Sequence, residues 1–171
     1  MFGLFKRNQS ILFININKIL KVYKSTAFFF IIAQVGFGCT EYPKDPNRTL
    51  HKVTNGNLTV GFSENSPWVV KKEGEPEPSG IEPALIKSFA STLHAKIIWE
   101  NGSEEQLFKK LEDRKIDVVI AGLTDENPWK TRMIGLTKPY RIKGDEKHVI
   151  AVQEGENAFL IQLEIFLNMA K

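Results

Sequence analysis

The run from Ile116 to Ala121, IDVVIA, constrains the fold of this chain more than any other stretch. It is short and rich in β-branched residues, and Asp117 is its only polar member. Such a run is typical of a strand that is buried on both faces, as strands are in parallel sheets. The turn Gly122-Leu123-Thr124 follows at once and offers backbone N–H groups and a hydroxyl. Because ligands of open α/β sheets bind beyond the carboxyl ends of the strands, the stretch predicts both a fold class and a place for a site.

The segments around this run alternate between strand and helix patterns. The helix pattern is clearest where Ile81, Leu85, Phe89 and Leu93 recur at intervals of four. A capping box, Ser103 to Gln106, opens the next helix. We expect strands over 58–62, 68–71, 96–99, 116–121 and 148–153, and helices over 81–94, 104–114, 127–133 and 156–170. This order predicts an α/β fold in three layers, with a mostly parallel sheet flanked by helices.

The charge of the chain is divided unevenly. The whole chain carries +3, but residues 1–39 hold five basic residues and no acidic residue, so the remainder is weakly acidic. A weakly acidic body argues against a nucleic-acid partner.

Cys39 is the only cysteine, which excludes an intrachain disulfide, and without a Cys/His cluster a structural zinc site is not expected. We expect no metal and no cofactor.

Residues 1–39 have the organisation of a secretory signal peptide. Lys18, Lys21 and Lys24 precede the apolar run 27–38, which is too short for a comfortable membrane span. Cys39 follows directly and resembles the lipidated cysteine of the bacterial lipobox. The alternatives are a plain secretory signal and an uncleaved anchor. We expect a membrane-anchored lipoprotein, with 40–56 as a mobile tether and 57–171 as the folded body.

Four segments of the body together resemble the bacterial extracellular solute-binding proteins of family 3, the polar amino-acid receptors of ABC importers. They are LTVGFSENSPW, GIEPALIKSFASTLHA, LEDRKIDVVIAGLT and LTKPY, in the order of the family. The resemblance implies a single lobe of the periplasmic-binding-protein-like (type II) fold. Members of the family carry a second lobe after the Pro-Tyr strand, whereas only 141–147 separate that strand from the closing segment here.

The resemblance also implies a set of ligand-binding residues. Gly122 and Thr124 match the turn that receives the α-carboxylate of an amino acid, Ser63 matches a polar contact, and Trp68 matches an aromatic that packs on the ligand. Trp68 can equally be a core aromatic. The family's arginine falls on Lys130 by register, and Arg132 is the nearest arginine. Only arginine offers the planar fork that suits a carboxylate, so both remain candidates.

The sequence leads to three hypotheses about function. The first is the substrate-binding component of an ABC-type importer, which takes a small polar solute, an amino acid, in the periplasm or at the cell envelope and meets a permease or sensor. The second is a truncated lobe that acts as a protein-interaction or sensory module. The third, an enzyme, is not expected, because no nucleophile and base are paired and no catalytic carboxylates converge.

Overall fold

The computed structural model describes residues 45–170, apart from the side chains of Lys130 and Thr131. The chain divides after Glu41, and only the second unit, Tyr42–Lys171, is described below. The signal peptide and Cys39 therefore lie outside the described residues. Within 45–170 no helix is both long and apolar enough to cross a membrane.

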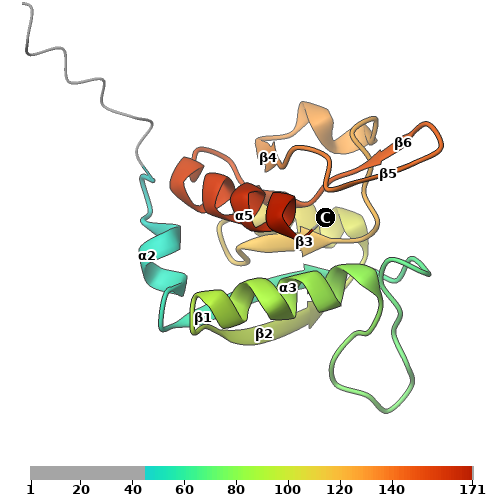
Figure 1. Cartoon of the computed structure of the whole chain (residues 1–171), viewed down its shortest axis with the longest axis horizontal. Helices are drawn as coiled ribbons and strands as arrows, with labels where there is room; N and C mark the ends of the chain where they lie inside the picture. The colour runs from blue at the N-terminus through green and yellow to red at the C-terminus, as the bar shows by residue number, and fades with distance from the viewer. Residues whose placement is uncertain (1–44, 171) are drawn as a thin grey trace, which may run out of the picture. The chain divides into compact units, whose positions relative to one another are not determined.

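The second unit alternates strands and helices over 57–136, and three further strands precede the last helix (Figure 1). Its elements are α2 (Thr49–Val53), β1 (Asn57–Phe62), α3 (Ile81–Thr92), β2 (Lys96–Asn101), α4 (Glu104–Glu112), β3 (Val118–Ile120), the 3-10 helix η2 (Pro128–Thr131), β4 (Ile134–Leu136), β5 (Arg141–Lys143), β6 (Glu146–His148), β7 (Ala151–Gln153) and α5 (Asn157–Met169).

Five strands form one sheet in the order β2-β1-β3-β7-β4. β1 is parallel to both β2 and β3, and β7 is antiparallel to both β3 and β4, so four of the five strands point the same way. The connections through α3 and α4 are the crossovers that parallel strands require. The prediction of a mostly parallel sheet flanked by helices is confirmed.

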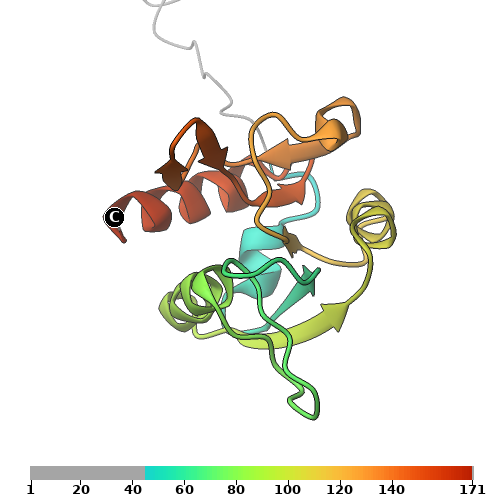
Figure 2. The ribbon, with the colours of Figure 1, turned by 90° about the vertical axis from the view of Figure 1, so that its right-hand side faces the viewer.

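Helices cover both faces of the sheet, as Figure 2 shows, with α4 on one side and α3 and α5 on the other. The alternation along β3 explains why both faces must be covered. Val118 and Ile120 belong to the apolar cluster under α3 and α5. Val119 belongs to the cluster under α4. All three side chains are fully buried, so β3 is the buried central strand that its sequence indicates.

Two expected strands differ in the structure. The segment 68–71 forms only isolated bridges, Asn65 with Val69 and Val70 with Ser79, because a loop and not a strand runs beside it. The segment 148–153 is divided between β6 and β7, which belong to different sheets.

A short hairpin stands where the resemblance would imply the insertion of a second lobe. β5 pairs with β6 in antiparallel fashion, with Lys143 opposite Glu146, so Gly144 and Asp145 alone form the loop. Gly144 has φ +61, as the first position of a type II′ turn demands. The chain therefore reverses within two residues and continues directly into β7.

The folded unit begins before residue 57. Residues 49–53 form α2, whose Thr49 and Val53 are fully buried, and Val53 belongs to the main apolar cluster. The expectation of a tether over 40–56 is therefore wrong for its described part, 45–56. The physical reason lies at Glu156, more than a hundred residues away in the sequence.

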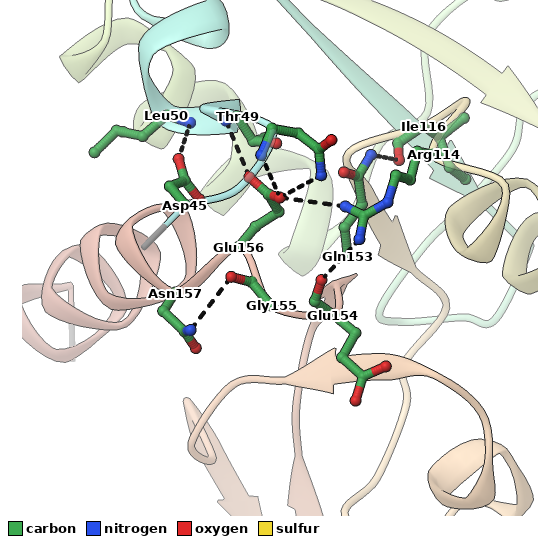
Figure 3. A network of polar contacts seen from close by, with 11 residues as sticks. Asp45, Thr49, Leu50, Arg114, Ile116, Gln153, Glu154, Gly155, Glu156 and Asn157 are labelled. Atoms are coloured by element: carbon green, nitrogen blue, oxygen red, sulfur yellow. Dashed lines mark hydrogen bonds and ion pairs between the residues drawn. The ribbon is translucent and has the colours of Figure 1, made fainter. Parts of the chain in front are cut away.

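Glu156 holds this N-terminal segment through its buried carboxylate (Figure 3). Its Oε1 accepts hydrogen bonds from the N–H and the Nδ2 of Asn47, at 3.0 and 2.6 Å. The same oxygen forms an ion pair with Arg114 Nη1 at 3.2 Å. Its Oε2 accepts the N–H of Thr49 at 3.1 Å. Asp45 lies beside it and accepts the N–H of Leu50 at 3.0 Å. We call these contacts the Glu156 network.

Candidate functional site

The carboxyl ends of β1 and β3 meet at one edge of the sheet, here called the carboxyl edge. The strands are neighbours and parallel, with Phe62 paired with Ile120. The N–H of Ser63 donates to the carbonyl of Ile120 at 3.1 Å, and Asn65 Nδ2 donates to the carbonyl of Ala121 at 2.8 Å. The two loops that carry Ser63 and Gly122 are thus held side by side, as the sequence predicts.

Gly122 is fixed as glycine by both its backbone and its surroundings. Its φ is +64, and a Cβ at this position would lie 2.7 Å from both Asn65 Nδ2 and Trp68 Cδ1. Its N–H donates to Glu82 Oε2 at 2.9 Å. The N–H that was expected to face a ligand is therefore taken by a side chain of the protein.

Glu82 is a fully buried carboxyl group at the first turn of α3. Its second oxygen accepts the hydroxyl of Tyr140 at 2.7 Å. Burial raises the pKa of Glu82 to about 7, although the hydrogen bonds from Gly122 and Tyr140 favour the ionised form. Burial and the neighbouring Glu82 also raise the pKa of Tyr140. The sequence analysis missed Glu82, because an acid in a first helical turn is usually exposed.

This raised pKa predicts that stability depends on pH with the sign opposite to that of most carboxylates. The folded state binds the proton of Glu82 more tightly than the unfolded state does, so the free energy of unfolding should fall as the pH rises from about 4.5 to about 7. The slope from one such group reaches about 1.4 kcal/mol per pH unit. Urea unfolding at a series of pH values should show a smaller slope for Glu82→Gln than for the parent protein. Burial also raises the pKa of Asp45, to about 6, so Asp45 contributes to the pH dependence with the same sign. This contribution of Asp45 should remain in the Glu82→Gln variant.

Trp68 is a buried aromatic whose face is covered by the hairpin. It is 5% exposed, and the His148 ring lies on it with the centroids 3.6 Å apart and 33° between the planes. The ring nitrogens of His148 are buried and find no hydrogen-bond partner among residues 45–170. Its Nε2 lies 3.5 Å from Glu146 Oε2. Of the two interpretations of Trp68, this geometry favours the core aromatic.

Thr124 faces His148 across a narrow antiparallel bridge. The N–H of Asp125 donates to the carbonyl of Lys147, and the N–H of Val149 donates to the carbonyl of Leu123, both at 2.9 Å. This pattern turns the N–H of Thr124 away from the hairpin. In the part of the chain that the structure describes, that N–H and the hydroxyls of Thr124 and Ser63 have no hydrogen-bond partner. Three neutral donors are thus free at the carboxyl edge.

Arg132 lies at the opposite end of the sheet. Val118 of β3 and Gly135 of β4 both pair with Val152 of β7, so Gly135 lies level with Val118 in the sheet. A residue just before β4 therefore lies at the amino end of β3. Arg132 pairs there with Glu112, the last residue of α4, at 3.3 Å. The structure does not bring Arg132 to Gly122 and Thr124. Lys130 is part of η2 on the same stretch, and its side chain is not described.

Lys147 is a cation beside the carboxyl edge that the sequence analysis missed. Its Nζ lies 3.7 Å from Asp125 Oδ2, and its side chain is 52% exposed. It belongs to β6, so it reaches this edge only because the hairpin folds back onto Thr124 and Asp125. No group of three or more His, Cys, Asp and Glu residues within the described range could hold a metal ion.

This arrangement can be compared with known proteins. The model of the bacterial extracellular solute-binding proteins, family 3, matches residues 58–164, more than half of the chain. The chain belongs to this family. A search of curated proteins gave no match. As a family 3 protein, this chain is built as a single lobe, and the family places it outside the cytoplasm, in the periplasm or envelope.

Solved structures agree with this family. The arginine-bound form of domain 1 from TmArgBP superposes with a TM-score of 0.61 at 25% identity, over 70% of this chain and 97% of that one. The ancestral cationic amino-acid binding protein AncCDT-1 gives 0.62 at 14% identity, over 71% and 93%. The unliganded L-cystine receptor of Neisseria gonorrhoeae gives 0.57 at 12% identity, over 71% and 90%. AncCDT-1 is also described as a precursor of cyclohexadienyl dehydratase, but the family itself is one of binding proteins.

Proposed function

We propose that this lobe binds a small polar solute, an amino acid, at its carboxyl edge, as the substrate-binding component of an ABC-type importer. The observation that carries the proposal is the set of free donors there: the N–H and hydroxyl of Thr124 and the hydroxyl of Ser63. A carboxylate is a ligand group that such hydrogen-bond donors suit. Lys147 supplies the positive charge that Arg132 and Lys130 were expected to supply.

The likeness to an isolated domain supports the proposal further. Domain 1 from TmArgBP is described in an arginine-bound form, and this chain covers nearly all of it. A lone lobe buries less of a ligand than a closed two-lobe cleft does, so we expect a dissociation constant in the range of roughly micromolar to millimolar. Titration calorimetry of the parent protein against the common amino acids tests this. If no amino acid binds at millimolar concentration, the receptor proposal fails and the protein-interaction module takes its place.

Variants of two cations separate the revised site from the one expected from sequence. Lys147→Ala should weaken amino-acid binding by roughly tenfold. The side chain of Lys147 is half-exposed, so its charge-assisted hydrogen bond should contribute a free energy at the low end of the range for such bonds. Arg132→Ala should leave the dissociation constant unchanged, because Arg132 is paired with Glu112 at the other end of the sheet. The reverse result in calorimetry would move the site to η2.

Lipid anchoring is a separate part of the proposal. Cys39 would be modified after removal of the leader and would hold the lobe at the membrane, near a permease or sensor partner. Cys39→Ser should then abolish incorporation of a labelled fatty acid and release the protein from membranes. Absence of label in the parent protein would leave the plain secretory signal or the uncleaved anchor.

A further inference from the structure

β2 is an edge strand that still has room for a neighbour. It ends the sheet order β2-β1-β3-β7-β4, and within residues 45–170 it pairs with β1 alone. Figures 1 and 2 both draw it as the outermost strand. With six residues, Lys96–Asn101, it is one of the two longest strands of the sheet. An edge of this length presents unpaired N–H and C=O groups that can extend the sheet into another chain.

The hydrogen bonds to β1 determine which residues of β2 face outward. The N–H of Lys96 donates to Gly56 at 2.9 Å, and that of Gly102 donates to Phe62 at 3.2 Å. Since successive residues of a strand face opposite sides, the even-numbered residues from 96 to 102 face β1. The backbone groups of Ile97 and Trp99 therefore face away from the sheet and are free to pair.

The side chains of β2 are unusually apolar for an edge. Ile98 is 46% exposed and shares its face of the sheet with Lys96 and Glu100. Ile97 and Trp99 occupy the other face, where they border a groove of about 470 Å³ against α3. Edge strands are commonly protected by charges or bulges, but the centre of this one is Ile-Ile-Trp.

We propose that β2 is a self-association surface, where it pairs antiparallel with β2 of a second copy of this chain about a two-fold axis at Ile98. In this register Ile97 of each copy forms a hydrogen-bonded pair with Trp99 of the other copy. Both residues present outward-facing backbone groups, as the ladder requires. Lys96 of each copy then lies opposite Glu100 of the other copy, which gives two such pairs. Ile98 lies opposite Ile98 of the second copy. Aromatic with β-branched and opposite-charge pairs are the favourable cross-strand combinations.

The neighbouring registers lack this match. A two-fold axis at Ile97 would place Glu100 opposite His94 and Lys96 opposite Ile98. An axis at Trp99 would place Lys96 opposite Gly102 and Glu100 opposite Ile98. Registers between these would pair outward-facing with inward-facing backbone, which cannot form a ladder. Only the axis at Ile98 joins each lysine to a glutamate.

The pairing would leave the carboxyl edge open. Because the two β2 strands run in opposite directions, the carboxyl edges of the two copies would point to opposite ends of one continuous sheet. The dimer therefore does not build a shared ligand cleft. It does not depend on amino-acid binding, and each can be present without the other.

Disulfide formation at single positions tests the register in the full chain. In a Cys39→Ser background, Ile98→Cys should form an intermolecular disulfide under mild oxidation, because the Cα atoms of a non-hydrogen-bonded antiparallel pair lie about 4.5 Å apart, within disulfide range. Lys96→Cys is the matched control on the same strand and face, and its two copies would be too far apart to join. Equal dimer yields at the two positions, or none at 98, would overturn the proposal.

A charge reversal tests the same register in solution. Lys96→Glu places two pairs of glutamates face to face and should weaken the dimer about tenfold in sedimentation. The variant K96E/E100K/K110E should restore it, since it reverses the intermolecular pairs and keeps the contact of Glu100 with Lys110 within the chain. A parent protein that stays monomeric, a dimer indifferent to Lys96→Glu, or a triple variant without recovery would each contradict this interface.

Discussion

Gly122→Ala is expected to lower the free energy of unfolding by about 2–4 kcal/mol, the sum of strained backbone and overpacking. The residue has φ +64, and the added Cβ would lie 2.7 Å from Trp68 Cδ1. Trp68 cannot retreat, because the His148 ring covers its face at 3.6 Å. The substitution should also abolish amino-acid binding, because it displaces the turn that carries Thr124.

Gly144→Ala is the matched control for this prediction. Its φ of +61 is nearly the same, but a Cβ there meets nothing within 4 Å. It should therefore show only the cost of the left-handed backbone, about 1–2 kcal/mol. Urea unfolding of both variants measures the difference. Equal losses would mean that the contact with Trp68 and Asn65 contributes nothing.

Glu156→Ala is expected to cost about 3–5 kcal/mol and to release α2 from the body. The carboxylate is fully buried, and its loss would leave the N–H groups of Asn47 and Thr49 without an acceptor and would remove the ion pair with Arg114. Burial alone would raise the pKa of Glu156, but the hydrogen bonds from Asp45, Asn47 and Thr49 lower it to about 2. Its contribution should therefore be present above about pH 4.5 and be lost as the pH falls toward 2.

Glu164 provides the control on the same helix. Its carboxylate accepts from Lys138, whose side chain is 86% exposed, so Glu164→Ala should cost less than about 1 kcal/mol. Urea unfolding and limited proteolysis within 45–56 distinguish the two glutamates. If Glu156→Ala remained as resistant to protease as the parent protein, α2 would be held by Val53 and its apolar neighbours alone.

The parts of the fold that could be predicted from the sequence depend on local patterns. The run 116–121 indicates its burial by composition, and Val118 to Ile120 are buried on both faces. The capping box at Ser103 forms as expected, with the N–H of Gln106 donating to the serine hydroxyl at 3.4 Å. Gly122 and Thr124 follow a strand end, and the parallel pairing of β1 and β3 was enough to place them beside Ser63.

The parts that could not be predicted depend on partners far away in the sequence. The stretch after Thr124 runs back along α4, where Trp129 stacks on Phe108 with the ring centroids 5.0 Å apart, and this carries Arg132 away from the carboxyl edge. Spacing gives the distance along the chain but not its direction. The docking of α2 likewise depends on Glu156, whose role no pattern within 40–56 could indicate.

The most direct test of the binding site is an arginine titration followed by backbone amide NMR. The amide signals of Ser63, Gly122 and Thr124 should shift in a saturable way, together with that of Lys147, because these residues line the carboxyl edge. The amide signals of Arg132 and of Ile98 on β2 should stay in place. Saturable shifts at Arg132 without shifts at Thr124 would contradict the site described here and place the ligand at the other end of the sheet, near Glu112.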